Sequence, residues 1–467
     1  MAFLIGAANS AADVTFSVAN SCRFNGSDSS LSKTVGDAAV TNAAFSCWFK
    51  RSVIGANQTI YATDSSNEVR IKIHSDDKLD IYSYTDDYQY RLQTNRLFRD
   101  PAAWYHLVIR VDTTNGTADN RIRVYINGTQ ETSFAARTNP GSSDNIEWFQ
   151  GATGYIGMSE DGSSNPFGGY LAEIVMVDGS TTAHTVFGEF DEDSPTIWKP
   201  INVSSLSVGT NGWYLDFEAS ANLGNAADGG TDWTENNLAA VDQTTDTPTN
   251  NFATGNPIAS QAGSAQSDSL LTFAEGNLLM SANSETGIAN IGVSAGKWYW
   301  EVKILTDQDG LAIGACNEHF NITAELAYDD PSSASATGAK AFSYSGDGST
   351  MVVIGDGTSQ SYGSAISVND IIGVALDVDS ADQTCTFYLN GSSQGSLDIT
   401  NLDAGEFYFP AVGNWSTADV STSWNFGNPT YANTSSAADE NGYGDFEYAP
   451  PSGYLALCTK NLGSTGG

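Results

Sequence analysis

Apolar and polar residues alternate with a period of two along much of the chain. In segment 69–74, Ile71 and Ile73 alternate with Arg70 and Lys72. The same alternation occurs in segments 78–84, 106–112 and 121–128. Successive side chains on a β-strand point to opposite sides, so this period is typical of strands with one buried face. Short runs of Gly, Asn, Asp and Ser separate these segments, as tight turns require. The pattern predicts an all-β fold with two antiparallel, jelly-roll-like β-sandwich domains.

Strand-rich sequence occurs in two blocks, which sets the expected domain organisation. The expected parts are an N-terminal apolar anchor or first strand (1–13), a sandwich (14–180), a connecting strap (181–267), a second sandwich (268–427) and a looped tail with one strand (428–467). The strap is polar, yet it contains large aromatic residues, among them Trp198, Trp213, Tyr214, Phe217 and Trp233. Each buries roughly 150 to 250 Å² when packed. We therefore expect an ordered, mostly irregular strap that lies over one or both sandwiches and ends in the polar stretch 244–251.

The acidic residues are distributed unevenly. The formal charge is −36, from 19 Lys and Arg against 55 Asp and Glu. Residues 1–137 contain 14 basic and 14 acidic residues, whereas residues 138–467 contain five Lys, no Arg and 41 acidic residues. Such an acidic surface repels phosphate backbones and argues against a nucleic acid partner. We hypothesise that the neutral first part anchors the protein to another protein and that the acidic remainder projects outward. Adaptation to salty water is the alternative, because salt screens repulsion between charges.

Cysteine content and the N-terminal sequence bear on where the protein is made. The five cysteines include no CxxC pair, so neither a disulfide framework nor a zinc ribbon fits. The apolar run within residues 1–13 has no basic residue before it, unlike a secretory signal. No stretch approaches the ~20 apolar residues of a membrane span. We expect synthesis in a cytoplasm and no membrane insertion.

Five segments of the first block occur in the order typical of one family. They are SCRFNGSDSSLS (21–32), FSCWFKR (45–51), AAWYHLVIRVD (102–112), RVYINGT (123–129) and GGYLAEIVMVDG (168–179). With them the block resembles a laminin-G-like, concanavalin-A-like domain, which implies a jelly-roll sandwich that often binds glycans or proteins. Trp48 and Trp104 are expected to fill the layer between its sheets. Asn127-Gly128 predicts a two-residue hairpin.

The second block resembles a SPRY domain. The matching segments are GKWYWEVKI (296–304), GLAIGACNE (310–318), DIIGVALDVDSADQTCTFYLNG (370–391), FYFPAVGNWS (407–416) and NFG (425–427). SPRY domains are generally binding modules without catalytic activity. The resemblance therefore implies recognition through loops at one end of a sandwich.

The combination of segments resembles virion proteins of tailed bacteriophages, particularly marine ones. Besides the two domains, the shared segments are GEFDEDSPTIWKP (188–200), GTNGWYLDF (209–217), TDWTENNL (231–238), TDTPTNNF (245–252) and PPSGYLALCT (450–459). The resemblance implies a tail fibre, receptor-binding or capsid-decoration role, with a trimer favoured by analogy to phage fibres. Long fibres usually contain coiled-coil, collagen-like or β-helical shafts, and this sequence has none. A short appendage or capsid decoration fits better.

Two strings match catalytic signatures only superficially. GSSQG (391–395) satisfies the GxSxG pattern around Ser393, but that nucleophile needs a strand-to-helix turn and a histidine partner, and here it follows a hairpin turn. GVSAGKW, which contains Lys297, is one residue short of a phosphate loop and lacks Ser or Thr after the lysine. We expect both strings to be turns beside strands.

Glycan hydrolysis is the enzymatic alternative, because glycosidases of concanavalin-A-like fold use two carboxylates ~5 to 9 Å apart. The related bacterial glucanases arrange acidic residues as ExDxxE. Here Glu189 and Asp191 have the first spacing, but residue 194 is Ser. Asp377 and Asp379 share one face of a predicted strand and are expected to flank a turn. The third carboxylate of the pattern is missing, and we expect no enzyme activity.

The sequence supplies few ligands for transition metals. Its four histidines, His74, His106, His184 and His319, are widely spaced. Calcium is the cofactor that the sequence leaves open. The pair Asp307 and Asp309, or the pair Glu160 and Asp161, would supply oxygen ligands if loops converge. In so acidic a protein such pairs are mostly solvated turns, and we expect no required cofactor.

The candidate ligand-binding residues are Trp415 and the four hairpin residues Tyr84, Asp86, Asp87 and Tyr88. Trp415 lies in a polar loop of the second block, where packing does not readily explain a large ring. The hairpin combines aromatic faces and carboxylates, which suits sugar rings. The alternative is that Tyr82 with Tyr84, and Tyr88 with Tyr90, each share a face and form ordinary cross-strand pairs.

These observations favour a non-enzymatic virion surface protein that mediates adhesion to a host-surface glycan or protein. Its expected partners are other virion proteins, contacted through the N-terminal domain, and the host receptor. It would be made in the bacterial host cytoplasm and displayed on the virion surface. A glycan-cleaving enzyme and a secreted lectin-like binding protein remain the alternatives.

Overall fold

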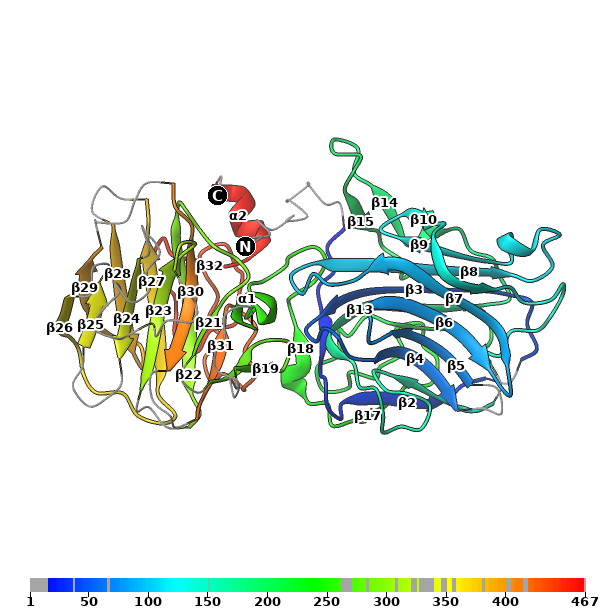
Figure 1. Ribbon diagram of the computed structural model, residues 1–467, viewed down its shortest axis with the longest axis horizontal. Helices are drawn as coiled ribbons and strands as arrows, with labels where there is room; N and C mark the ends of the chain where they lie inside the picture. The colour runs from blue at the N-terminus through cyan, green and yellow to red at the C-terminus, as the bar shows by residue number, and fades with distance from the viewer. Residues whose placement is uncertain are drawn as a thin grey trace. The chain divides into compact units, whose positions relative to one another are not determined.

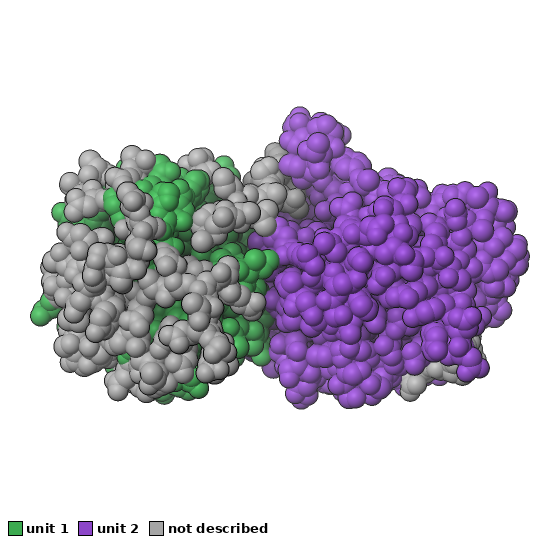
Figure 2. All heavy atoms as spheres, in the orientation of Figure 1, with its two compact units in different colours: residues 1–10, 250–467 green, residues 11–249 purple. Residues whose placement is uncertain are grey.

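The computed structural model describes most of the chain as two compact units. The first unit along the chain comprises Ala11–Thr249, drawn in purple in Figure 2, and the second includes Asn250–Gly467, drawn in green there. Antiparallel sheets dominate both, which confirms the predicted all-β fold. The described residues are 16–36, 38–64, 68–149, 151–261, 271–282, 285–306, 310–320, 326, 340–345, 351–354, 358–379, 383–399, 405–414 and 419–465. The expected anchor or first strand at 1–13, the loop residue Trp415, and the pair Asp307 and Asp309 lie outside these residues.

The first unit contains two large antiparallel sheets (Figure 1). Sheet 1 has the order β10-β9-β8-β3-β13-β1-β18, and β16 also pairs with β13. Its strands are β1 (Ser21–Asn25), β3 (Asn42–Arg51), β8 (Trp104–Asp112), β9 (Ile122–Ile126), β10 (Thr129–Glu131), β13 (Gly168–Asp178), β16 (Trp213–Leu215) and β18 (Gln243–Thr244).

Sheet 2 of the first unit has the order β11-β7-β6-β5-β4-β12-β2-β17. Its strands are β2 (Ser30–Thr34), β4 (Gln58–Asp64), β5 (Glu68–Ile73), β6 (Lys78–Tyr84), β7 (Tyr88–Leu97), β11 (Phe134–Thr138), β12 (Thr153–Ile156) and β17 (Thr234–Asn236). A separate hairpin joins β14 (Gly188–Phe190) and β15 (Trp198–Pro200). Short 3₁₀ turns are η1 (Ala118–Asn120), η2 (His184–Val186) and η3 (Ala240–Asp242).

The layer between the two sheets forms the main core of the first unit. Phe45, Cys47 and Phe49 of β3 are fully buried in it. Its tryptophans are Trp148, Trp213 and Trp233. The prediction that Trp48 and Trp104 fill this layer is wrong, because both pack on the outer face of sheet 1 with Trp198 and Tyr170. In FSCWFKR both strand phases carry large apolar residues, so periodicity alone does not decide which phase faces inward.

The first part of the predicted strap, residues 181–249, belongs to the first compact unit. Three of its short strands extend the sheets: β16 pairs with β13, β17 with β2, and β18 with β1. Trp213, Phe217 and Trp233 enter the core, whereas Trp198 and Tyr214 cover the outer face of sheet 1. The strap therefore completes the core and shields one sheet face from water.

The polar stretch at the end of the strap is buried. Asp246 is 1% exposed, and its carboxylate lies 2.8 Å from Lys50 Nζ. Trp104 Nε1 donates to the same carboxylate at 3.1 Å. Charged groups are rarely buried unless they are paired and hydrogen-bonded, so these contacts fix residue 246 to strands β3 and β8.

The hairpin predicted at Asn127-Gly128 connects β9 and β10. Asn127 and Gly128 have φ angles of 48° and 73°, which is the positive-φ pair of a type I′ turn. A Cβ atom on Gly128 would lie 2.1 Å from the Trp198 ring. Trp198 is 3% exposed, so the glycine allows the turn and the strap to pack closely.

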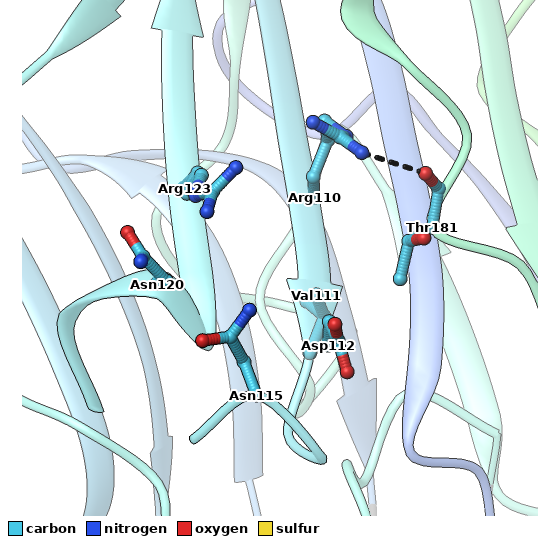
Figure 3. Close-up of a pocket in the computed structure, with 7 residues that line it drawn as sticks. All are labelled: Arg110, Val111, Asp112, Asn115, Asn120, Arg123 and Thr181. Atoms are coloured by element: carbon cyan, nitrogen blue, oxygen red, sulfur yellow. Dashed lines mark hydrogen bonds between the residues drawn. The ribbon is translucent and has the colours of Figure 1, made fainter. Parts of the chain in front are cut away.

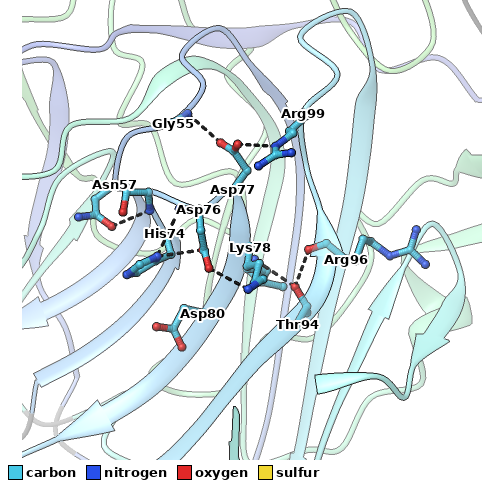
Figure 4. Close-up of polar contacts among 12 residues, drawn as sticks. Gly55, Asn57, His74, Asp76, Asp77, Lys78, Asp80, Thr94, Arg96 and Arg99 are labelled. Carbon is cyan, nitrogen blue, oxygen red and sulfur yellow. Dashed lines mark hydrogen bonds and ion pairs between the residues drawn. The ribbon is translucent and has the colours of Figure 1, made fainter. Parts of the chain in front are cut away.

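The turn between β5 and β6 contains a buried charge cluster (Figure 4). Asp77, with φ 64°, accepts hydrogen bonds from Gly55 N and Arg99 Nε at 2.8 Å each. Its Oδ1 also lies 3.1 Å from Arg51 Nη1, and the Arg51 side chain is fully buried. Arg51 Nε donates to Gln58 at 2.8 Å. Asp77 thus links the turn to strand β3, to the loop between β3 and β4, and to the residues after β7.

The second unit also contains two antiparallel sheets. One has the order β19-β20-β31-β22-β27-β28-β29, and the other has the order β21-β30-β23-β24-β25-β26. The strands of the first are β19 (Thr272–Ala274), β20 (Leu279–Ala282), β22 (Lys297–Ile304), β27 (Ile371–Asp377), β28 (Thr384–Leu389), β29 (Ser392–Asp398) and β31 (Val420–Asn425). Those of the second are β21 (Thr286–Ile288), β23 (Leu311–Asn317), β24 (Ala341–Ser345), β25 (Met351–Ile354), β26 (Thr358–Ser361) and β30 (Tyr408–Asn414).

The C-terminal tail covers the outer face of β22 and β27. Its strand β32 (Leu455–Ala456) pairs in parallel with β22, and helix α2 (Thr459–Thr465) follows. A helix α1 (Pro257–Gln261) lies earlier in this unit. Glu301 of β22 is fully buried and accepts hydrogen bonds from Glu447 N and Tyr448 N at 3.0 and 2.8 Å. Burial raises the pKa of Glu301 to about 7 even though these bonds favour its ionised form. Glu301 therefore fixes the tail to the sandwich.

Within the part of the chain that the structure describes, no helix has both the length and the apolar character required to cross a membrane.

Candidate binding surface

The outer face of sheet 2 brings aromatic and charged side chains together. Antiparallel pairing places Arg70 of β5 opposite Tyr82 of β6, and Tyr82 opposite Arg91 of β7. The next row pairs Lys72 with Asp80. We name this region the tyrosine–arginine surface. Its residues are Arg70, Lys72, Asp80, Tyr82, Tyr84, Tyr88, Arg91 and Glu160.

Three tyrosines form an edge-to-face cluster on this surface. The Tyr88 ring centroid lies 5.6 Å from that of Tyr82 and 5.2 Å from that of Tyr84. Tyr82 is buried, Tyr88 is half-buried and Tyr84 is 37% exposed. Exposure therefore increases across the cluster from Tyr82 through Tyr88 to Tyr84. Edge-to-face contacts hold aromatic rings in a fixed orientation, which suits a surface on which a ligand stacks.

Cationic groups surround the tyrosines. The Arg91 guanidinium lies 4.8 Å from the Tyr88 centroid, and Lys72 Nζ lies 5.4 Å from the Tyr82 centroid. Arg91 also forms two hydrogen bonds to Asp80, at 3.0 and 2.9 Å, which raise the arginine pKa. Burial lowers the pKa of Lys72, which is 8% exposed. The surface thus combines fixed rings with oriented N–H donors.

A second ion pair, between Arg70 and Glu160, lies at the side of the tyrosine–arginine surface. The Arg70 guanidinium contacts Glu160 and lies 3.3 Å from Glu68. Glu68 lies in the same strand, β5, and Glu160 lies in the loop after β12, so the guanidinium is held between β5 and that loop. Charge-assisted contacts of this kind fix side-chain orientation.

The structure places the predicted hairpin residues at the end of this surface. Tyr84 and Tyr88 pair across the β6–β7 turn, and Asp86 and Asp87 are exposed within it. Asp87 Oδ1 accepts from Tyr88 N at 2.8 Å. The expected pairing of Tyr88 with Tyr90 on one face is wrong. A register shift at the turn puts Tyr88 beside Tyr82, whereas Tyr90 points into the core.

Arg70, Lys72 and Arg91 belong to this surface, although the sequence pattern did not indicate them as candidate binding residues. Each was assigned to the polar phase of a strand or left unassigned, and their proximity depends on the register of three paired strands. The sequence does contain an indication of this surface, because these residues and the tyrosines lie in consecutive segments with alternating apolar and polar residues, joined by short turns. Short hairpins place such polar phases on one face.

The superficial catalytic motifs have structural roles. Ser393 is exposed in β29 and accepts from Gly395 N at 3.2 Å, within a hairpin rather than a strand-to-helix turn. Lys297 begins β22 and lies 3.0 Å from Asp377. Asp379 accepts from Gly296 N at 2.6 Å. These residues therefore stabilise the turns in which they lie.

A buried Ser46–His106 contact has the wrong polarity for a nucleophilic serine. Trp198 Nε1 lies 2.8 Å from His106 Nδ1, and Ser46 Oγ lies 2.8 Å from His106 Nε2. An indole N–H only donates, so Nδ1 accepts and the ring proton resides on Nε2. Nε2 therefore donates to Ser46, the reverse of general-base activation. Burial lowers the pKa of His106 to about 3, so its ring stays neutral.

The carboxylates considered for glycan hydrolysis stabilise turns. Asp191 accepts hydrogen bonds from Asp193 N and Ser194 N at 3.0 and 2.9 Å and pairs with Lys199. Glu189 also lies near Lys199, at 3.5 Å. These contacts account for the Glu189 and Asp191 spacing.

Metal-ligand candidates are likewise engaged elsewhere. Glu160 pairs with Arg70, and Asp161 accepts from Ser163 N and Ser164 N. His74 contacts Asp76 at 2.9 Å, and His184 stacks on Tyr125 with centroids 4.0 Å apart. Over the described ranges, no group of three or more His, Cys, Asp or Glu residues is arranged to hold a metal ion.

Comparison with known protein families assigns both sandwiches. Residues 25–187 match the concanavalin A-like lectin/glucanases superfamily, and residues 297–428 match the SPRY domain. The chain therefore contains a concanavalin A-like domain followed by a SPRY domain. Together these two domain types indicate a binding role. No curated protein matches the chain.

Solved structures include folds similar to parts of the chain. The SPRY domain of human HERC1 is 16% identical over 36% of this chain and 96% of its own, with a TM-score of 0.28. A human SPRY domain is 19% identical over 35% and 96%, with a TM-score of 0.26. A heptameric SAP-like pentraxin from Limulus polyphemus is 17% identical over 37% and 82%, with a TM-score of 0.28.

Proposed function

We propose that the protein is a non-enzymatic virion surface protein of a tailed bacteriophage that attaches to a host-surface glycan or protein. It would serve as a short tail fibre, a receptor-binding protein or a capsid decoration. The tyrosine–arginine surface is the observation that supports attachment. It offers rigid aromatic faces beside oriented cationic donors, and such groups suit the apolar faces and hydroxyl or carboxylate groups of a sugar.

The phage assignment rests on segments shared with virion proteins. Segments 188–200, 209–217 and 231–238 lie in the strap of the first unit, and segment 450–459 lies in the tail of the second. Segments 188–200 and 209–217 contribute Trp198 and Tyr214 to the outer face of sheet 1, and segment 231–238 contains β17, which extends sheet 2. The resemblance therefore extends beyond the two domains. Display in several copies, for example as a trimer, would multiply a weak single-site affinity.

The contacts of the catalytic candidates support the non-enzymatic assignment. The carboxylates Asp191 and Asp377 pair with lysines, and His106 holds its proton toward Ser46. A glycan-release assay tests this part, because accumulation of oligosaccharide products from host polysaccharide would contradict it.

Glycan or host-cell binding by the full chain tests the surface. We expect Tyr84→Ala together with Tyr88→Ala to weaken binding by about tenfold or more, since loss of aromatic stacking costs roughly 1 to 3 kcal/mol. The matched control is Phe190→Ala, which removes another exposed ring, 41% exposed, from the β14–β15 hairpin. Equal binding by the double variant and the control would reject the surface as the attachment site.

Location in the particle tests the virion assignment separately. Mass spectrometry and immunogold labelling of purified particles should detect the protein on the virion exterior. Its absence from purified particles would refute the virion assignment and favour a secreted lectin-like protein, even if the tyrosine–arginine surface binds glycans.

A further inference from the structure

Two arginines face each other on the outer face of sheet 1, away from the tyrosine–arginine surface. Arg110 of β8 and Arg123 of β9 are direct partners in the antiparallel register. Figure 3 shows their side chains next to each other on neighbouring strands. Like charges directly opposite each other destabilise a sheet unless something compensates them. The pairing therefore requires an explanation.

The protein supplies little compensation for these two charges. Arg110 Nη2 donates to the Thr181 carbonyl oxygen at 2.8 Å, which is a neutral acceptor. Among the described residues, no carboxylate lies within ion-pair distance of Arg110 or Arg123. The Nε atoms of both arginines are buried without a hydrogen-bond partner in the described part of the chain. Buried donors normally have partners, so these groups point to a ligand.

Seven of the other arginines of the first unit pair with carboxylates, whereas Arg121 donates to two backbone carbonyl groups. Arg51 pairs with Asp77, Arg91 with Asp80, and Arg96 with Glu131. This contrast occurs in a chain with a net charge of −36, where acidic side chains are abundant. The shortage of acidic partners at Arg110 and Arg123 is therefore local.

A small cavity lies beside the two guanidinium groups. It has a volume of about 40 Å³. Its lining consists of Arg110, Val111, Asp112, Asn115, Asn120, Arg123 and Thr181 (Figure 3). This volume exceeds the roughly 10 to 15 Å³ that one water molecule requires, but it does not admit a sugar ring. The cavity suits a single charged group.

The one carboxylate in the lining is engaged with its own turn. Asp112 Oδ1 accepts from Thr114 Oγ1 at 2.6 Å and from Thr114 N at 3.1 Å. Asn115 Oδ1 accepts from Thr117 N at 3.0 Å, so its amide nitrogen remains as a donor. The positive charge of Arg110 also reaches His184, where it adds to burial in lowering the histidine pKa. The cavity lining therefore carries two guanidinium groups against one carboxylate.

We propose that the Arg110–Arg123 cavity binds one small oxyanion, a sulfate, a phosphate or a carboxylate. Two guanidinium forks present parallel N–H donors that match the oxygen spacing of such groups. The ion would relieve the repulsion between the paired charges. This site does not depend on the attachment function, because it lies on the opposite sheet and its ligand is defined by charge.

Calorimetric titration of the full chain with sodium sulfate, at constant ionic strength in chloride, tests the site. We expect Arg110→Gln and Arg123→Gln each to weaken sulfate binding by about tenfold or more, because charge-assisted hydrogen bonds are lost. Arg96→Gln is the matched control, since it removes the same charge outside the cavity. Equal weakening by all three variants, or no binding by the native chain, would overturn the proposal.

A stability measurement separates ligand binding from a structural role. Without sulfate, Arg123→Gln should leave the melting temperature unchanged or raise it, because one of two repelling charges is removed. With sulfate, only the native chain should gain stability. A lower melting temperature of Arg123→Gln in chloride alone would show that the arginine is needed for folding and would contradict the proposal.

Two further ligands identify the source of the oxyanion. Glucose 6-sulfate and glucuronate carry the group on a sugar, whereas inorganic sulfate and phosphate carry it alone. Tighter binding of a sugar anion than of inorganic sulfate, lost in Arg123→Gln, would assign the cavity to an acidic glycan. Tighter binding of the inorganic ion would assign it to a free ion. Either result supports an oxyanion site.

Discussion

Replacement of Asp77 by asparagine measures how much one buried charge contributes to stability. The backbone of Asp77 has φ 64°, a conformation that asparagine adopts readily, and the two side chains have nearly the same shape. The substitution therefore removes the charge while retaining the fold of the turn. It leaves the fully buried Arg51 guanidinium without the carboxylate that lies 3.1 Å away.

The expected cost follows from this burial. Removing one partner of a buried ion pair costs roughly 3 to 5 kcal/mol, because the remaining charge stays out of water. That free energy increases the equilibrium constant for local opening of the structure about 10² to 10⁴ times. The matched control is Asp119→Asn, whose carboxylate is 73% exposed and lies 3.4 Å from Arg137. An exposed pair contributes only about 0 to 1 kcal/mol.

Hydrogen exchange of the full chain measures the effect where it occurs. Peptides from β3 and β6 should exchange about 10² to 10⁴ times faster in Asp77→Asn, with peptides of the second unit as the internal reference. The two guanidinium groups and the Gly55 hydrogen bond outweigh burial and lower the pKa of Asp77. Its stabilisation is therefore present above about pH 4 and lost as pH falls, and the variant should show a weaker acid dependence. Exchange as slow as in Asp119→Asn would refute the reasoning.

Two further predictions concern the strap and its sheet. Gly128→Ala should destabilise the first unit by about 1 to 3 kcal/mol more than Gly229→Ala, because both glycines have positive φ but only Gly128 lies against Trp198. Thermal melting measures the difference, and equal melting temperatures of the two variants would contradict the close packing. Burial raises the pKa of Glu173 to about 7, so the first unit should lose stability between about pH 4.5 and pH 7, because over this range the carboxyl ionises in the unfolded chain but keeps its proton in the folded state. Glu173→Gln should remove this loss and stabilise the unit by up to about 3 kcal/mol at pH 8, as measured by urea unfolding. If the variant keeps the native dependence of stability on pH, Glu173 is ionised in the folded state and the prediction is wrong.

The alternation of side chains was sufficient to predict the sandwiches. Ile71 and Ile73 point to the core, and Asn127-Gly128 forms its hairpin. The same reasoning failed for Trp48, because neighbouring residues in both strand phases are apolar. Its neighbours on the outer face, Trp104, Tyr170 and the strap residue Trp198, are distant in sequence, and local periodicity contains no information about them.

The strap and the candidate sites depend on tertiary pairing. The strap strands β16, β17 and β18 have three, three and two residues, too few to show a period. The sequence indicated Tyr84 and Tyr88 as candidates, but their neighbour Arg91 required the register of β6 and β7. Arg110 and Arg123 likewise meet only because β8 and β9 pair in one register.

The extent of the strap limits how the first domain can be isolated. A fragment ending at residue 187, where the family match ends, would lack Trp213 and Trp233. It would also lose β17 and β18, and so leave one edge of β2 and one edge of β1 unpaired. Open strand edges and uncovered apolar faces promote aggregation. Recombinant production of this domain for ligand screening therefore requires a fragment that continues to residue 249.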